Sequence, residues 1–204
     1  MAVLLFCIYC ACGHAQKRIE QKIPWGNLNA IKIDADSIFS VHIETRSMDH
    51  LDVRVKAEGE HSEHVALKTE VVKDVLELSV GLQPIFNVSD DKLNAHKAIS
   101  IELFIIMPES RQLQVSSDIA SVNLKGMYEN VIVELRNGPC VLDEFSGTAV
   151  VNTIGGDIDV FSKLDFKIDA MTKHGELHLN SNSRSKYGLS LNSIYGDITV
   201  NKSQ

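Results

Sequence analysis

One short pattern, which occurs five times between residues 113 and 200, constrains the fold of this chain more than any other feature. Each copy places two apolar residues seven and five positions before a small residue, and two more at two and four positions after it. The small residues are spaced 18, 18, 19 and 21 residues apart, and they are Ala120, Gly138, Gly156, Gly175 and Gly196. A period of about this length is typical of stacked, quasi-one-dimensional folds. We name each copy by its small residue.

The apolar slots keep the same phase in every copy. From the Ala120 copy to the Gly196 copy they are Leu113/Val115 and Val122/Leu124, Val131/Val133 and Cys140/Leu142, Ala149/Val151 and Ile158/Val160, Ile168/Ala170 and Leu177/Leu179, and Leu189/Leu191 and Ile198/Val200. Neighbouring strands lie about 4.8 Å apart, so stacked copies would form one continuous apolar core. The glycine would mark a corner that needs positive φ or lacks room for a Cβ atom.

We therefore predict an all-β chain with a single-stranded, right-handed β-solenoid over residues 113–204, in which parallel rungs of about 18–21 residues stack in sequence order. The alternative is a β-sandwich of hairpins, because Asn137-Gly138 and Gly155-Gly156 are good two-residue hairpin turns. His174-Gly175 and Tyr195-Gly196 suit such turns less well.

Residues 31–112 are expected to form a strand-rich N-terminal portion, since their apolar residues alternate with period two. A polar, turn-rich stretch up to residue 98 interrupts these strands and predicts a loop. Residues 16–30 are interpreted as a lead-in, with Pro24-Trp25-Gly26 as a turn.

The first fifteen residues predict a signal peptide. They contain no Asp, Glu, Lys or Arg, and Gly13 and Ala15 are the small residues of a cleavage site before Gln16. A buried N-terminal strand is one alternative. A lipoprotein anchored through Cys12 is another, although Tyr9 departs from the usual lipobox. After cleavage only Cys140 would remain, in an inward slot where a thiol acts as a small apolar group.

The net charge of −7 argues against a nucleic-acid partner, because such binding needs clustered Lys and Arg. The sequence has no block of basic residues either, which makes an electrostatic membrane-binding patch an unfavourable interpretation.

The segment ISIELFIIMPESRQLQVSSDIASVNLKG (residues 99–126), followed by GGDIDV, HGELHL and YGDITV, resembles the bacterial putative-adhesin domain family of unknown function. The resemblance covers about residues 28–200. It implies an exported β-solenoid with a strand-rich N-terminal portion and offers no catalytic residues. Two places depart from the family's pattern: Ala120 replaces glycine, and Pro139 rather than an acid follows Gly138.

Acidic residues follow three of the glycines and would form a ladder on one edge of the coil: Asp157, Glu176 and Asp197. Hard cations such as Ca²⁺ bind several carboxylate oxygens, but an acid after glycine is also ordinary turn chemistry. We assign no metal to this ladder.

Histidines occur in two suggestive groups, His61-Ser-Glu-His64 and His174-Gly-Glu-Leu-His178. The second departs from the HExxH zinc motif, because Glu176 is misplaced and the segment is not helical. We interpret both groups as polar surface residues. The sequence thus predicts no catalytic, cofactor-binding or metal site.

Four apolar residues point away from the predicted interior: Ile132, Val141, Val150 and Met171. We expect the N-terminal strands to cover them; the alternative is an adhesive lateral face. The last rung in sequence, that of Gly196, would be left as an open edge, which predicts weak end-to-end self-association.

These features together predict an exported, non-enzymatic envelope protein of the putative-adhesin type, in the periplasm or at the cell surface. Its partner would be an unidentified envelope protein or a glycan. Two alternatives are a glycan-cleaving solenoid enzyme, which would need paired carboxylates in a cleft, and a self-assembling solenoid scaffold like the cytoplasmic bactofilins.

Overall fold

A computed structural model describes residues 16–83, 99–180 and 185–202. These residues confirm the all-β class, since they contain fifteen strands and one three-residue 3₁₀ helix, η1 (Ser62–His64). The strands are β1 (Gln16–Pro24), β2 (Ala30–Asp34), β3 (Ser40–Arg46), β4 (His50–Glu58), β5 (Val65–Val72), β6 (Val75–Leu82), β7 (Ser100–Pro108), β8 (Gln112–Ser117), β9 (Ser121–Asn137), β10 (Cys140–Gly155), β11 (Ile158–Ser162), β12 (Lys167–Thr172), β13 (Leu177–Leu179), β14 (Gly188–Ser193) and β15 (Ile198–Lys202). The predicted signal peptide and most of the predicted loop before residue 99 lie outside the described residues. None of the described helices has the length and apolar character needed to cross a membrane.

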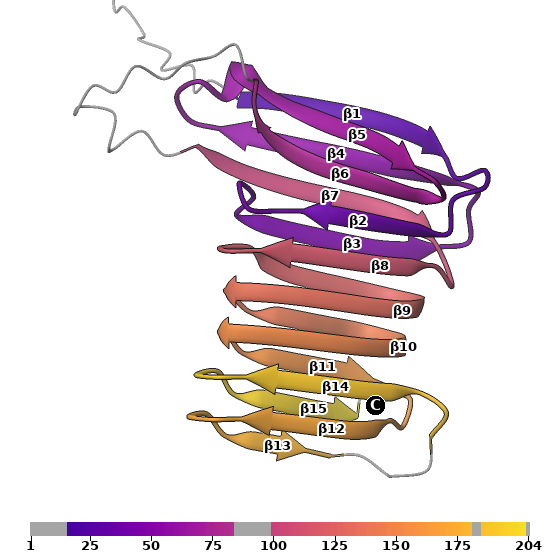
Figure 1. The fold of residues 1–204 in the computed structure, drawn as a ribbon, viewed down its shortest axis with the longest axis vertical. Coiled ribbons are helices and arrows are strands. Elements are labelled where there is room, and N and C mark those ends of the chain that lie inside the picture. The colour runs from indigo at the N-terminus through magenta and orange to yellow at the C-terminus, as the bar shows by residue number, and fades with distance from the viewer. Residues whose placement is uncertain (1–15, 84–98, 181–184, 203–204) are drawn as a thin grey trace, which may run out of the picture.

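All fifteen strands belong to one sheet, which folds back on itself into two layers (Figure 1). The back layer follows the order β1-β4-β7-β3-β9-β10-β11-β15-β13, and the front layer follows β5-β6-β2-β8-β9-β10-β14-β12. The long strands β9 and β10 pass through both layers. Pairing is parallel from β6 and β7 onward and antiparallel at the N-terminal end, where β1 joins β4, β4 joins β7 and β5 joins β6.

The apolar slots of the sequence pattern pair with one another and form the core between the layers. In the back layer Val122 pairs with Cys140 and Cys140 with Ile158, and each of these side chains is buried. The predicted phase is therefore correct at β11, where Ile158 is fully buried and its neighbour Asp159 is partly exposed. Alternation of apolar and polar residues keeps one face of each strand in this core.

The order of the last two copies differs from the sequence order, so the prediction of sequential stacking is wrong. Strand β14 of the Gly196 copy pairs with β10, and β12 of the Gly175 copy pairs with the outer side of β14. In the other layer β15 pairs with β11, and β13 pairs with the outer side of β15. The Gly196 copy thus lies inside the stack and the Gly175 copy ends it, as Figure 1 shows at the lower end.

The N-terminal portion shares the core with the copies. Strand β2 pairs in parallel with β8, and β3 pairs in parallel with β9, so Ile31 and Ile33 lie beside Leu113 and Val115. The sequence pattern does not detect this further strand-corner-strand unit, because residues 47–111 separate it from the Ala120 copy and its corner is one residue longer. The structure also places β1 within residues 16–30, the segment interpreted as a lead-in.

The glycine corners stack directly on one another. A Cβ atom on Gly156 would overlap the carbonyl of Gly138, one on Gly196 would overlap the carbonyl of Gly156, and one on Gly175 would overlap that of Gly196. Glycine is needed at these corners because two backbones approach each other closely. The series of overlaps independently gives the same order, with the Gly175 copy outermost.

Candidate functional site

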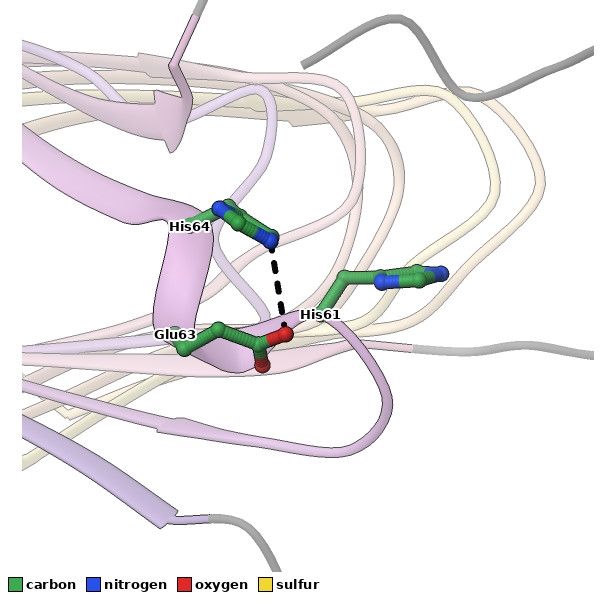
Figure 2. Close-up of side chains that lie close together, drawn as sticks. All are labelled: His61, Glu63 and His64. Atoms are coloured by element: carbon green, nitrogen blue, oxygen red, sulfur yellow. Dashed lines mark ion pairs between the residues drawn. The ribbon is translucent and has the colours of Figure 1, made fainter.

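Three side chains with metal-binding chemistry lie together at the N-terminal end of the molecule, on the turn that contains η1 (Figure 2). One ligand atom from each of His61, Glu63 and His64 lies within 4.8 Å of the other two. Glu63 Oε1 and His64 Nε2 are 3.3 Å apart. Among the described residues, this is the one group of three or more His, Cys, Asp and Glu side chains that meets this distance limit.

The backbone of the turn brings these side chains together. His61 adopts a left-handed conformation with φ 67° and ψ 10°, and its carbonyl accepts a 2.9 Å hydrogen bond from the His64 amide. Lys17 on β1 donates from Nζ to the Glu63 carbonyl at 2.7 Å and ties the turn to the neighbouring strand. Two imidazoles and one carboxylate form a ligand set that zinc accepts, and three protein ligands leave a position for water.

The second histidine group is dispersed by the structure. His178 on β13 contacts Glu176 at 3.3 Å, whereas the ring of His174 stacks on Tyr195 with a centroid distance of 5.1 Å. These residues do not form a three-ligand group by the same limit. Sequence spacing alone could not distinguish the two groups, because the outcome depends on the tight turn at residue 61.

The predicted acidic ladder exists, and two of its three carboxylates, those of Asp157 and Asp197, accept hydrogen bonds from backbone amides. Asp157 Oδ1 accepts from the Asp197 amide at 2.9 Å, and Asp197 Oδ1 accepts from the Glu176 amide at 2.8 Å. Asp157 and Asp197 thus each bind the corner stacked on them, whereas the Glu176 carboxylate contacts His178. This is the turn chemistry that the sequence analysis set against cation binding.

Asp159, two residues after Asp157, lies on the outward face of β11 beside Thr199 of β15. Partial burial raises the pKa of its carboxyl, and the charges of Asp157 and Asp197 raise it further, while a hydrogen bond with Thr199 opposes them. A raised pKa suits a general acid. The described cavities lie elsewhere: they are lined mainly by residues of β1 to β10.

A ladder of hydroxyl groups, which the sequence analysis missed, accompanies the glycine corners. Ser193 Oγ donates to the Gly156 carbonyl at 3.2 Å, and Thr172 Oγ1 donates to the Gly196 carbonyl at 2.8 Å. Ser117 makes the equivalent bond to the Ala35 carbonyl at 2.9 Å. The available signal was a Ser or Thr three positions before four of the five small residues. These bonds satisfy buried carbonyl groups and hold successive corners in register.

An aromatic column at the opposite corner was also missed. The rings of Tyr128 and Phe145 stack at 5.7 Å, Phe145 and Phe166 lie 6.2 Å apart, and Phe166 and Tyr187 lie 6.5 Å apart. Tyr128, Phe145 and Phe166 are buried. This column is part of the core, as is Cys140, where complete burial raises the thiol pKa to about 12. At neutral pH that thiol is protonated and unreactive.

Of the four outward apolar residues, Ile132, Val141 and Val150 are partly buried and Met171 is exposed. Ile132 lines a depression of about 350 Å³ together with Val72 and Val75 of the β5–β6 hairpin. The hairpin therefore covers Ile132 in part. Met171 is 65% exposed, so the prediction that N-terminal strands cover it is wrong. The reason is distance along the stack: Met171 lies on β12, at the opposite end from β5.

No family model matches the sequence, and no curated protein matches it. The structure, in contrast, is similar to a putative cell adhesion protein from Clostridium sporogenes, with a TM-score of 0.63 and 16% sequence identity, over 93% of this chain and 100% of that chain. This chain shares the fold of that protein. The predicted resemblance to the bacterial putative-adhesin family is confirmed at the level of the fold.

Two further solved structures are more distantly similar. A putative adhesin from Bacteroides fragilis has a TM-score of 0.43 and 12% identity over 91% of this chain and 97% of its own. A putative adhesin from Parabacteroides merdae has a TM-score of 0.31 and 14% identity over 92% and 97%. Scores at this level add nothing to the fold comparison.

Proposed function

We propose that this chain is an exported, non-enzymatic protein of the bacterial cell envelope that acts in adhesion or scaffolding. The observation that carries the proposal is the fold shared with the Clostridium sporogenes protein over its whole length. That protein is named a putative cell adhesion protein, and the adhesive role comes to this chain by analogy of fold. An envelope protein or a glycan is the expected partner.

The proposed architecture is a right-handed β-solenoid, closed at its N-terminal end by antiparallel strands. Parallel in-register pairing of the apolar slots, stacked glycine corners and the hydroxyl ladder all support stacked rungs. The strand-rich portion 31–112 and the repeats 113–204 would then be two parts of one stack, since β2 and β3 form a rung of the same kind as the later copies.

The alternative of a glycan-cleaving enzyme has less support. Such enzymes need two carboxyl groups that face one sugar from a cleft. Here the stacked carboxylates of Asp157 and Asp197 bind backbone amides. A depression of about 440 Å³ is lined by the carboxylates of Asp34, Glu70 and Glu77, and that of Glu77 is held in a 3.4 Å ion pair with Lys32.

Export predicts a mature chain that begins at Gln16. We expect mass spectrometry of the native protein, isolated from cell fractions, to find this N-terminus in the envelope or the medium. The motivation is the uncharged apolar segment that ends in Gly13-His14-Ala15. An intact Met1 on cytoplasmic protein would contradict export and, with it, the proposed function. A lipid-modified Cys12 would retain export and replace the cleavage site.

A further inference from the structure

The end of the stack formed by the Gly175 copy exposes residues that occupy core slots elsewhere. Leu177 is 44% exposed and Leu179 is 45% exposed, whereas Ile198 and Val200, their partners in the next strand inward, are 0% and 3% exposed. In the front layer Ile168 and Ala170 are only partly buried. Met171 is exposed beside them. The interior core therefore continues to the surface at this end without a covering strand among the described residues.

Among the described residues, no strand pairs with the outer edge of β12 or of β13. In β13 the Glu176 carbonyl and the Asn180 amide bond toward β15, at 2.9 Å each. A strand in a parallel ladder directs alternate peptide groups to opposite sides, so the peptide groups of Leu177 and Leu179 face outward. In β12 the Lys167 amide bonds to Tyr187 of the inner side, which leaves those of Ile168 and Ala170 facing outward. Such an edge is a template for another strand.

The two edges restrict the partner that fits. Two packed layers of a sheet lie about 10 Å apart, so a partner must present two strand edges at this spacing to pair with both at once, with apolar side chains between them. A second copy of the same end meets this condition, because it presents the same two edges at the same spacing. Twofold symmetry makes such an interface self-complementary. Lys167 and Asp169, on the outward face of β12, supply charges of both signs for the contact.

The opposite end of the stack is less suited to pairing in its back layer. Its back-layer edge is β1, which carries Lys17, Arg18, Glu20 and Lys22, and charged edge strands oppose association. Arg18 and Arg54 both contact Glu20, at 2.7 Å and 3.1 Å, which holds these charges along the edge. The open end of the stack is therefore formed by the Gly175 copy. The sequence order had predicted the Gly196 copy at this end.

We propose that two copies of this chain associate head to head through the Gly175 copy, with β12 pairing to β12 and β13 to β13 in antiparallel fashion. The interface is a dimer contact that ends growth, because the N-terminal ends point away from it. This proposal is independent of the proposed function, since it concerns the state of the purified protein in any compartment.

Sedimentation velocity of the purified protein over a range of concentrations tests the dimer. We expect a reversible monomer–dimer equilibrium. Leu177→Lys would weaken it about a hundredfold, because it places like charges opposite each other across the interface. Leu179→Pro would have the same effect by blocking the outward edge. Both residues are half exposed, so the variants should keep the thermal stability of the parent protein.

Val72→Lys is the matched control, because Val72 is 43% exposed and lies on β5, the front-layer edge of the other end. It should leave the dimer unchanged. A monomer at every concentration overturns the proposal. So does a dimer that Leu177→Lys leaves intact, and so do oligomers that grow with concentration and dissociate with Val72→Lys, which would indicate head-to-tail stacking.

A different observation carries a second proposal. His61, Glu63 and His64 bring three ligand atoms within 4.8 Å of one another, and His61 holds a left-handed backbone conformation that is uncommon for a residue with a side chain. Zinc bonds of about 2.0–2.2 Å place tetrahedral ligands roughly 3.3–3.6 Å apart. Glu63 and His64 already meet that spacing. We infer that this turn binds a zinc ion through the two imidazoles and the carboxylate, with water completing the site.

Calorimetric titration of the untagged protein with zinc chloride tests this site. We expect one equivalent to bind, and His61→Ala and His64→Ala each to weaken binding by about tenfold or more. The double variant His174→Ala/His178→Ala is the matched control, because it removes two histidines of the dispersed group near Glu176. Absence of one-to-one binding, or an equal loss in the control variant, overturns the site and leaves adventitious binding only.

Discussion

Leu191→Asp is expected to prevent folding, whereas Leu179→Asp is expected to lower the free energy of unfolding by about 1 kcal/mol or less. Leu191 lies at 0% exposure on β14, between β10 and β12. An unpaired carboxylate at that position would cost several kcal/mol. The free energy of unfolding of a whole domain is typically about 5–15 kcal/mol, so this cost is a large part of it. Circular dichroism and thermal denaturation of the two variants provide the measurement.

This pair of substitutions decides the order of the stack. If the copies stacked in sequence order, Leu191 would be in the outermost copy and Leu179 in an interior one, so the two effects would be exchanged. A folded Leu191→Asp variant together with an unfolded Leu179→Asp variant would therefore contradict the arrangement in which the Gly175 copy ends the stack.

Gly196→Ala is expected to destabilise the protein by about 3 kcal/mol, at the upper end of the range for overpacked interiors. The added methyl group would overlap the carbonyl of Gly156, and the Asp157 amide lies 2.8 Å from its position. Both are backbone groups that cannot rotate away. Relief would require the two corners to separate, which would stretch the hydrogen bonds from Ser193 to Gly156 and from Asp197 to Asp157.

Gly188→Ala is the control for this second prediction. Its Cβ atom would meet only the Lys167 carbonyl, at 4.0 Å, and its φ is not in the left-handed region. We expect unchanged or slightly raised stability, since alanine restricts the unfolded chain more than glycine. Chemical denaturation measures both variants. Equal stability of Gly196→Ala and Gly188→Ala would disprove the close approach of the stacked corners.

The sequence alone determined the all-β fold class, the phase of the apolar slots and the positions of the glycine corners. Period-two alternation identifies which residues are buried, because successive side chains of a strand point to opposite faces. Ile158 and Cys140 lie in the core for this reason. The hydroxyl ladder was equally readable in the Ser or Thr that precedes most corners, although it was not recognised.

Only the tertiary structure decided which copy lies next to which, and which turn brings two histidines and a glutamate together. The slots of the Gly175 and Gly196 copies are all aliphatic, so the sequence pattern fits either order. The choice rests on contacts between segments distant in the chain, such as the 3.0 Å hydrogen bond from Asn192 to Asn152. For the histidines the deciding feature is the backbone of His61. Stacking order and side-chain convergence are properties of three-dimensional packing, and a one-dimensional period carries no information about either.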